Sequence, residues 1–363
     1  MAGMVVNISR LITTNHTTLI PKFNNNNNIH HINLPVSHSQ RPSTIIMSSA
    51  TTPTTITTIT PTPSSSESGC SWAEFAGNVS GEWDGFLADF TIDGKPIELP
   101  ENVVPNAYRE WEVQVFDWQT QCPTLAQPDK LSAMYKVIKL LPTVGCEADA
   151  ATRYTIDERT VGGVENMVSA FAYQSNGSYT AVWENPKGLE LEHCLIDPRD
   201  KESRVRIVQI VGVEDKKLVL KNIKVFVEQW YGPFRNGESL GGCAIRDSAF
   251  ACTKALDYSL VSGVWQSSNS VAAFQDSPNG VPQELVPVDG KQNLVREEAN
   301  LVLLPKNLWS SVTEMQDEGI TCCEVGWLLE PGRAITSKCI FSRNAELKEI
   351  VMSSETASPG PGL

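Results

Sequence analysis

The stretches VSGEW (residues 79–83) and VSGVW (residues 261–265) share four of their five residues, although 182 positions separate them. Each follows a short segment with helical periodicity. Each also begins a series of segments in which apolar and polar residues alternate, as they do in β-strands. An arginine lies near the end of each series, Arg246 in the first and Arg343 in the second. The repetition predicts two homologous β units, and the second is short because its series covers only about 80 residues.

The clearest hairpin pattern lies in ENMVSAFAYQSNGSYTAVWE (residues 165–184). Its Asn-Gly pair at 176–177 is the dipeptide that two-residue hairpin turns favour. A turn there places Ala172 opposite Ala181 and Ala170 opposite Trp183 on one face of the hairpin. Small residues that face a tryptophan suit the interior of a tapering barrel, so we expect this face to point inward.

Further strands are expected at 83–92, 108–119, 133–141, 153–158, 189–196, 204–212 and 218–230, and strands resume after Gly263. No helical period persists long enough for a βαβ unit, so the pattern predicts an all-β protein with up-and-down antiparallel barrels rather than a parallel sheet. We expect one unit over residues 67–255, a second over 256–350 and a disordered tail over 351–363.

The first 66 residues contain no Asp or Glu, three basic residues and many Ser, Thr and Asn. This composition predicts a plastid transit peptide, and a disordered tail is the alternative. The expected location is therefore the chloroplast, in the stroma rather than the thylakoid lumen. The nine cysteines all follow the leader and include no Cys-x-x-Cys, so in a reducing stroma we expect most of them to be small buried side chains.

Charge argues against a nucleic-acid partner, and hydropathy argues against a transmembrane segment. Residues 67–363 carry 26 basic and 42 acidic residues, a net charge of −16. Such a surface repels phosphate backbones, so we expect no nucleic-acid partner. No segment approaches the roughly 18 apolar residues that a membrane-spanning helix needs, and we expect no transmembrane segment.

The Gly-x-Trp at the start of a first strand, after a short helical turn and with an arginine on the final strand, resembles the lipocalins and the wider calycin superfamily. The resemblance implies barrel closure by Gly81, Trp83 and Arg246 in the first unit. In the second unit it implies closure by Gly263, Trp265 and Arg343, with each arginine packed across its tryptophan.

The stretch SGEWDGFLADFTIDGKPIELPENVVPNAYREWEVQVFDWQTQCPT (residues 80–124) is similar to a narrower, uncharacterised plant and cyanobacterial family of tandem calycin-like proteins. In plants these are nuclear-encoded and carry plastid leaders, and the similarity covers most of residues 70–350. The resemblance implies two lipocalin-like barrels and a plastid location, but no reaction. Relatives by fold include bilin-chromophore lyases and fatty-acid carriers.

Few residues point to catalysis. Four of the five histidines lie in the leader, which leaves His193, and one histidine does not make a triad or a histidine-based metal site. We interpret His193 as structural and expect no catalytic residues, no metal and no cofactor. Glu110 and Glu112 would share one face of the strand expected at 108–119, either as an acid–base pair in a cavity or, in the simpler interpretation, on a solvated surface.

The leading hypothesis is that a small hydrophobic molecule (a pigment, lipid or isoprenoid) binds in a barrel lumen. The residues expected to line it are Ala170, Ala172, Tyr179, Ala181, Trp183, Trp111 and Trp327. One alternative is an enzyme that acts on a tetrapyrrole or a lipid, which a polar group buried in the lumen would favour. The other is a non-enzymatic assembly or scaffold protein with a protein partner, which a solidly packed lumen would favour.

Overall fold

The computed structural model describes residues 67–144, 152–186, 188–214, 217–238, 249–275, 280–315 and 319–358. All of them belong to one compact unit, Thr62–Leu363. Strands dominate this part of the chain, so the fold is all-β, as the alternating pattern predicts. Arg246 and the leader lie outside the described residues.

The first sheet has eleven strands in the order β12-β6-β7-β8-β9-β10-β1-β2-β4, and both β3 and β5 pair with β4. All neighbours are antiparallel except β12 and β6. The strands are β1 (Trp83–Phe90), β2 (Asp117–Gln121), β3 (Thr124–Gln127), β4 (Ser132–Leu140), β5 (Arg153–Val161), β6 (Ala170–Tyr173), β7 (Tyr179–Asn185), β8 (Gly188–Ile196), β9 (Ser203–Glu214), β10 (Lys217–Trp230) and β12 (Gln283–Glu284).

The second sheet has eight strands in the order β13-β11-β19-β18-β17-β16-β15, and β14 also pairs with β11. Its strands are β11 (Val264–Ala273), β13 (Val286–Pro287), β14 (Gln292–Val295), β15 (Val302–Leu304), β16 (Leu308–Met315), β17 (Ile320–Glu330), β18 (Arg333–Phe341) and β19 (Leu347–Ala357). β19 pairs with β11 on one side and β18 on the other, so the sheet continues to Ala357 through residues that we expected in the tail.

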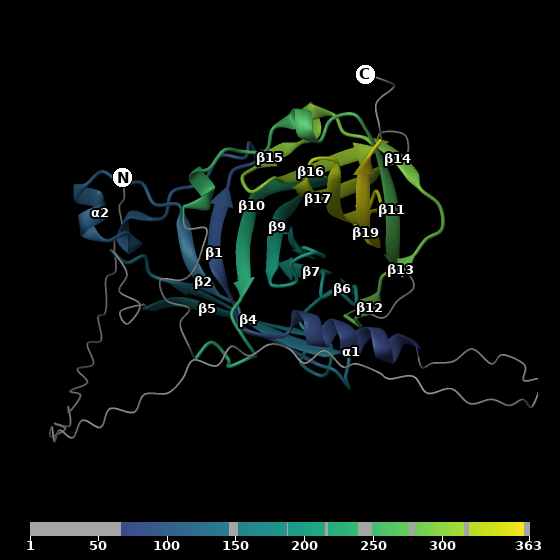
Figure 1. Cartoon of the computed structure of the whole chain (residues 1–363), viewed down its shortest axis with the longest axis horizontal. Coiled ribbons are helices and arrows are strands. Elements are labelled where there is room, and N and C mark those ends of the chain that lie inside the picture. Colours follow the sequence, from purple (N-terminus) through teal and green to yellow (C-terminus); the bar gives the residue numbers. More distant parts are fainter. Residues whose placement is uncertain are drawn as a thin grey trace, which may run out of the picture. The chain divides into compact units, whose positions relative to one another are not determined.

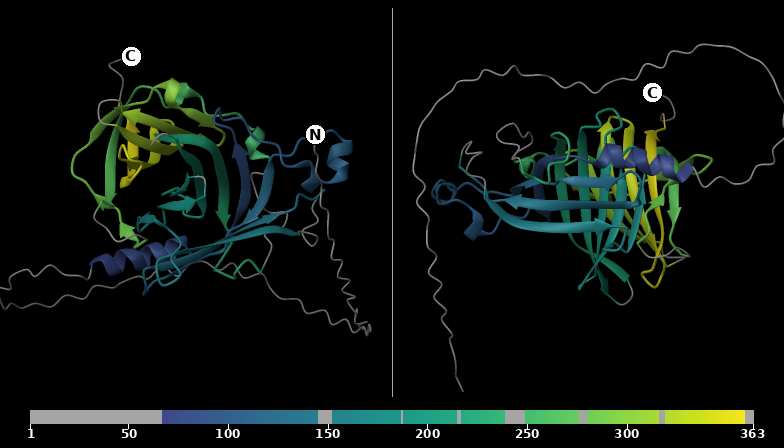
Figure 2. Two further views of the ribbon diagram at one scale, coloured as in Figure 1. Left: turned by 180° about the vertical axis from the view of Figure 1, so that it is seen from behind. Right: turned by 90° about the horizontal axis from the view of Figure 1, so that it is seen from below.

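Neither sheet is a closed barrel, because among the described residues the strands at the two ends of each order do not pair with each other. Helix α1 (Glu67–Val79) connects the two edges of the first sheet. The Trp72 indole N–H donates to the carbonyl of Gln127 in β3 at 2.7 Å, and the Asn78 amide donates to the carbonyl of Ser175, just after β6, at 2.7 Å. Figures 1 and 2 show α1 lying beside these strands.

The first sheet curls around a core of its own. Trp83, Trp118, Tyr135, Phe171 and Trp183 are buried together on one face, although they come from strands far apart in the sheet order. Contact between β4 and β7 requires that the strands between them bend around the enclosed side chains. This face is therefore the interior of the first sheet.

The opposite face of the first sheet packs against the second sheet. Ala172 and Leu191 contact a core that includes Cys339 and Ile350, and Ile207 belongs to a further core with residues of β16 and β17. The two curled sheets thus pack through their outer faces, and each keeps a separate interior.

A polar contact crosses this interface between the sheets. The Ser337 hydroxyl of β18 lies 2.7 Å from Oγ1 of Thr180 and 2.8 Å from Nδ1 of His193. Burial lowers the pKa of His193 to about 4, so its ring is neutral at physiological pH. His193 therefore helps to align the sheets, in agreement with its structural interpretation.

The hairpin register differs by one residue from the register that the Asn-Gly turn implies. Ala170 pairs with Val182 and Phe171 pairs with Ala181, because the connection includes five residues, 174–178. A shift of one residue exchanges the two faces of a strand. Ala170 and Ala172 consequently face the second sheet, whereas Ala181 and Trp183 face the interior of the first.

The prediction of a strand over residues 108–119 is also wrong. Residues Asn106–Glu110 form helix α2, which follows Pro105, and β2 begins only at Asp117. Glu112 has φ 54°, a left-handed conformation that breaks a strand. Glu110 and Glu112 are both exposed, so the paired acid–base interpretation is not supported.

The packing of Trp309 on Gly326 gives a test of the second sheet's interior. A Cβ at Gly326 would lie 2.0 Å from Cζ2 of Trp309, whose indole N–H is fixed by a 2.9 Å hydrogen bond to Glu324. Gly326→Ala should lower the free energy of unfolding by about 1–3 kcal/mol, measured in urea. Gly77→Ala is the control: no atom lies within 4 Å of its Cβ position in α1, so the change should stabilise by about 0.5–1 kcal/mol. Equal stability of Gly326→Ala and the unaltered protein would contradict this packing.

Candidate functional site

Each repeated stretch holds its tryptophan at the start of the first strand of a sheet. The Trp83 indole N–H donates to the Val79 carbonyl at 2.8 Å, and the Trp265 indole N–H donates to the Ser262 carbonyl at 3.3 Å. Gly81 has φ 143° and Gly263 has φ 89°, values that favour glycine. Both rings are buried, so the Gly-x-Trp motif acts as an anchor between a helical turn and the first strand.

Among the described residues, Arg204 and Arg296 place guanidinium groups near these two rings. Arg204 of β9 lies 4.2 Å from the Trp83 ring centroid, and Arg296 lies 5.9 Å from that of Trp265. Arg343 is exposed beside Gly319, because it follows the end of β18 that pairs with the start of β19, whereas Trp265 pairs with the end of β19. The partner that the resemblance implies for Trp83, Arg246, lies outside the described residues.

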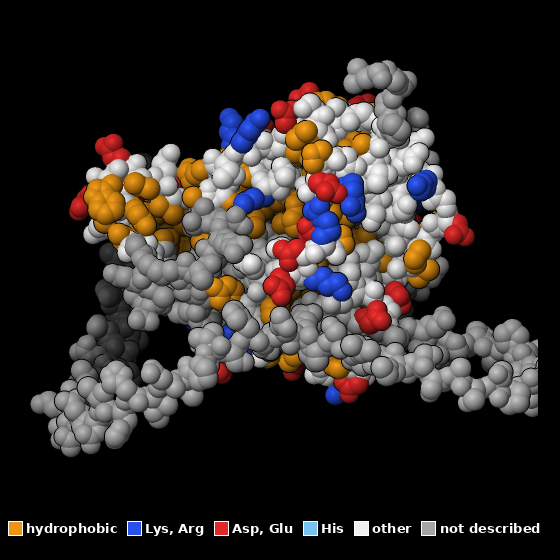
Figure 3. Space-filling view, viewed as in Figure 1, with side chains coloured by type: hydrophobic (Ala, Val, Ile, Leu, Met, Phe, Trp, Pro, Cys, Tyr) orange, Lys and Arg blue, Asp and Glu red, His pale blue; other side chains and the backbone are white. Residues whose placement is uncertain are grey.

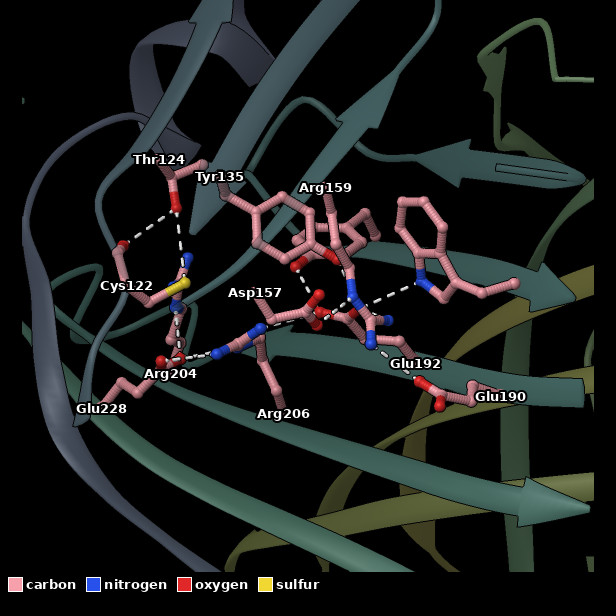
Figure 4. Close-up of polar contacts among 12 residues, drawn as sticks. Cys122, Thr124, Tyr135, Asp157, Arg159, Glu190, Glu192, Arg204, Arg206 and Glu228 are labelled. Carbon is pink, nitrogen blue, oxygen red and sulfur yellow. Dashed lines mark hydrogen bonds and ion pairs between the residues drawn. The ribbon is translucent and has the colours of Figure 1, made fainter. Parts of the chain in front are cut away.

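A buried ion network fills much of the first sheet's interior (Figure 4). Arg206 of β9 donates to Glu192 of β8 at 2.8 Å and twice to Glu228 of β10, at 2.8 Å each. Arg204 donates to the same Glu228 carboxylate, also at 2.8 Å. All four side chains are nearly inaccessible to water, so each charge depends on its partners in the network.

Glu192 is the central acceptor of this network. Tyr179 donates to it at 2.8 Å and the Trp183 indole N–H at 3.1 Å, and Tyr135 of β4 also donates to it. Burial alone would raise the pKa of Glu192, but the guanidinium groups of Arg206 and Arg159 outweigh burial and lower the pKa to about 2. Glu192 is therefore ionised throughout the physiological range.

Arg159 of β5 connects two strands of the first sheet that lie on opposite sides of its interior. It lies 2.8 Å from Glu190, 3.0 Å from Asp157 and 3.5 Å from Glu192. Its guanidinium also lies 5.0 Å from the ring centroid of Trp183. Since β5 and β8 are distant in the strand order, side-chain charges rather than backbone hydrogen bonds connect them here.

A cavity of about 160 Å³ opens beside this network. Its apolar wall consists of Leu87, Val137, Val208 and Phe226. Its charged lining includes four basic side chains (Lys139, Arg159, Arg206 and Lys224) and three acidic ones (Asp157, Glu190 and Glu192). We take this cavity as the candidate functional site because it joins apolar surface to buried charge inside a curled sheet.

The second sheet encloses a related but smaller cluster. Arg296 donates to Glu324 at 2.9 Å and to Glu355 at 2.6 Å, and its guanidinium lies 4.7 Å from the Trp309 ring centroid. Lys338 lies 3.0 Å from Glu324. Both interiors therefore place an arginine between two glutamates and beside tryptophan.

The residues that we expected to line a lumen divide among three places. Tyr179, Ala181 and Trp183 face the interior of the first sheet, and the first and last of them bind Glu192. Ala170 and Ala172 face the second sheet.

Trp327 packs at the interface between the sheets. Trp111 is 62% exposed and contacts Tyr108 near α2, where Figure 3 shows other exposed apolar side chains.

The sequence interpretation missed Arg204, Arg206, Glu192 and Glu228. The signal was present, since Arg204 and Arg206 share one face of a strand with the apolar Val208. Charged residues on a face that otherwise enters a core indicate ion pairing, but alternation alone does not reveal their partners.

Among the described residues, no group of three or more His, Cys, Asp or Glu side chains could hold a metal ion. Within the same part of the chain, none of the helices has the length and apolar character to cross a membrane.

No family model matches the chain, and no curated protein matches it significantly. Among solved structures, it is similar to a protein of unknown function from Nostoc punctiforme PCC 73102, which belongs to the DUF3598 family. The TM-score is 0.49 and the sequence identity 12%, and the alignment covers 79% of this chain and 99% of that chain.

The acid sensitivity of the network gives a second test. Because the pKa of Glu192 is lowered to about 2 from an ordinary 4.5, its ion pairs should stabilise fully above about pH 4.5 and progressively less as the pH falls toward 2. Glu192→Gln should lose about 3–5 kcal/mol of unfolding free energy at pH 7, because two guanidinium groups lose a buried partner. In urea melts, the difference in unfolding free energy between Glu192→Gln and the unaltered protein should become smaller between pH 5 and pH 3.

Glu158→Gln is the matched control for this series. Its carboxylate is 61% exposed and pairs with Lys136, so the change should cost less than about 1 kcal/mol. A cost for Glu192→Gln that did not change with pH would show that the network does not depend on the ionised carboxylate.

Proposed function

We propose that the interior of the first sheet binds a small amphipathic molecule, with an apolar body and an anionic head group. The observation that supports this most directly is the cavity of about 160 Å³ beside the ion network. The pigment, lipid or isoprenoid that the sequence suggests would place apolar atoms against Leu87, Val137, Val208 and Phe226.

The charges around the cavity favour a negative head group. Basic lining residues exceed acidic ones by one, and the three acidic side chains all contact Arg159. Lys139 stands in the lining with its ammonium group 5.3 Å from the Trp118 ring centroid. Its pKa is lowered, chiefly by burial and further by Lys224, so these two close cations gain from a nearby anion.

An enzymatic function has one observation in its favour, which is that polar groups are buried in the interior. These groups are poorly suited to proton transfer near neutral pH. The pKa of Glu192 is lowered to about 2, and burial and the Glu192 carboxylate raise the pKa values of Tyr135 and Tyr179 well above their ordinary range. Binding without catalysis therefore accounts better for this interior. The open cavity argues against the scaffold alternative, which expects a filled one.

We also propose that the two sheets are open members of the lipocalin-like (calycin) group, arranged in tandem. Three features support this. The first strand of each sheet begins at a Gly-x-Trp that follows a helical segment, and each tryptophan has a guanidinium group near its ring. Each sheet also curls around its own interior. The cyanobacterial relatives implied by the sequence resemblance would share this arrangement.

Filling the cavity tests the proposed binding. Val208→Trp should keep the fold, with an overpacking cost of about 1–3 kcal/mol, and should weaken octanoate binding at least tenfold in calorimetric titrations. Val213→Trp is the control, because it makes the same change on β9 at a side chain that is 49% exposed. Octan-1-ol should bind more weakly than octanoate if the basic lining recognises the head group. The proposal fails if octanoate does not bind, or if Val208→Trp binds it unchanged.

A plastid location is proposed from the leader's composition alone. Residues 1–70 fused to a fluorescent reporter should direct it into chloroplasts, because an acid-free, hydroxyl-rich segment is typical of a transit peptide. Confocal imaging of leaf cells checks this, with the reporter fused to residues 71–363 as the control. Reporter that stays in the cytosol with residues 1–70 would contradict the location.

A further inference from the structure

A second cavity, of about 310 Å³, lies where the two sheets meet. The first sheet contributes Asp84, Val205 and Val227, and the second contributes Trp327 and the turn that carries Asn307. Neither sheet forms this cavity alone. It is also separate from the interior cavity proposed above, with which it shares no lining residue.

Asp84 is the unusual residue of this cavity. Its side chain is on β1 and points to the face opposite Trp83, and the residue is only 2% exposed. Its Oδ1 atom has no hydrogen-bond partner among the described residues. A buried carboxylate oxygen without a donor costs free energy, so a ligand that supplies a donor would relieve that cost.

The rest of the lining defines the donor's chemistry. Arg204 and Glu228 also line the cavity, but both belong to the buried ion network, in which they are paired at 2.8 Å. Of the remaining charged lining residues, Asp84 and Asp200 are acidic and Lys306 is basic, which leaves an excess of one negative charge. The indole of Trp327 and the side chains of Val205 and Val227 supply aromatic and apolar surface.

The geometry of this lining leads us to propose that the cavity between the sheets binds a small organic ammonium ion. The ammonium N–H groups would donate to Asp84, the positive charge would lie near the Trp327 ring, and the apolar body would contact the two valines. A metal ion is a poorer fit, because no group of three acidic, histidine or cysteine ligands exists among the described residues.

A backbone hydrogen bond joins the two parts of the cavity wall that the second sheet supplies. Lys306 and Asn307 both have φ 60°, in the three-residue connection (305–307) between β15 and β16. The backbone N–H of Leu328 donates to the Asn307 carbonyl at 2.9 Å, which holds this turn against β17 beside Trp327. The turn and the indole thus form the second sheet's side of the cavity, and Asp84 belongs to the first sheet's side.

The ionisation of Asp84 should control the affinity. Burial first, and the neighbouring Glu82 and Glu228 carboxylates next, raise its pKa to about 7, while Gln121 and Arg235 oppose the shift. The other charged groups around the cavity are Asp200, Arg204 and Lys306. A cation binds the ionised carboxylate, so affinity should fall about tenfold between pH 8 and pH 6, as Asp84 takes up a proton.

Three probes with the same body separate the possibilities. The full chain should bind 2-phenylethylammonium with one-to-one stoichiometry in calorimetric titrations at pH 8, and should bind 2-phenylethanol and phenylacetate at least tenfold more weakly. Asp84→Asn keeps the shape of the side chain and should weaken ammonium binding at least tenfold. Trp327→Leu should weaken it several-fold, because the cation loses the aromatic face.

Asp93→Asn is the matched control. It removes one negative charge from an exposed turn just after β1 and should leave ammonium binding unchanged within twofold. Circular dichroism and urea melts verify that each variant is folded. The proposal is overturned if the three probes bind equally, if the ammonium ion does not bind, or if Asp84→Asn binds it as well as the unaltered protein. Octanoate binding should survive in Asp84→Asn, so failure here is distinguishable from failure of the interior site.

Discussion

The structure depends on the burial of Arg206 between Glu192 and Glu228. Removing three charges from water costs several kcal/mol for each ion, and only well-aligned partners compensate for that cost. The partners lie on β8, β9 and β10, and Glu192 also accepts hydrogen bonds from β4 and β7. A shift of one residue in β8, β9 or β10 would leave a charge unpaired, so the network specifies the register of these strands.

This constraint also explains how an open sheet encloses an interior. Backbone hydrogen bonds do not connect the two edges of the first sheet among the described residues, but Arg159 reaches across to Glu190, and α1 contacts β3 and the turn after β6. Side chains and one helix thus replace the strand pairs of a closed barrel. Such contacts leave room for the cavity beside the network, since they cover the gap without filling it.

The two sheets have similar ion clusters in their interiors but differ in how those interiors are packed. In each, one arginine lies between two glutamates, and a guanidinium group lies near the tryptophan at the start of the sheet's first strand. The first interior retains a cavity, whereas the second packs Trp309 against the backbone of Gly326. The second sheet also contributes Trp327 and its β15–β16 turn to the cavity at the interface. Its role in the molecule is therefore tied to the first sheet, with which it shares polar as well as apolar contacts.

The sequence by itself determined the features that depend on local pattern. Period-two alternation specified an all-β chain. The repeated Val-Ser-Gly-x-Trp located the first strand of each sheet, because in both units a glycine with positive φ and a buried indole join a helical segment to that strand. Strand ends near Phe90, Leu140 and Ile196 followed from the same alternation.

The tertiary structure decided which faces point inward and which charges meet. The Asn-Gly pair suggested a two-residue turn, but the five-residue connection reversed the faces of β6 relative to that expectation. Arg204 of β9 covers Trp83, and Asp84 is brought to Trp327 from a position 243 residues away. Alternation records only that a side chain lies on one of two faces. Its partners depend on how distant strands curl and pack, and no local pattern in the chain encodes that.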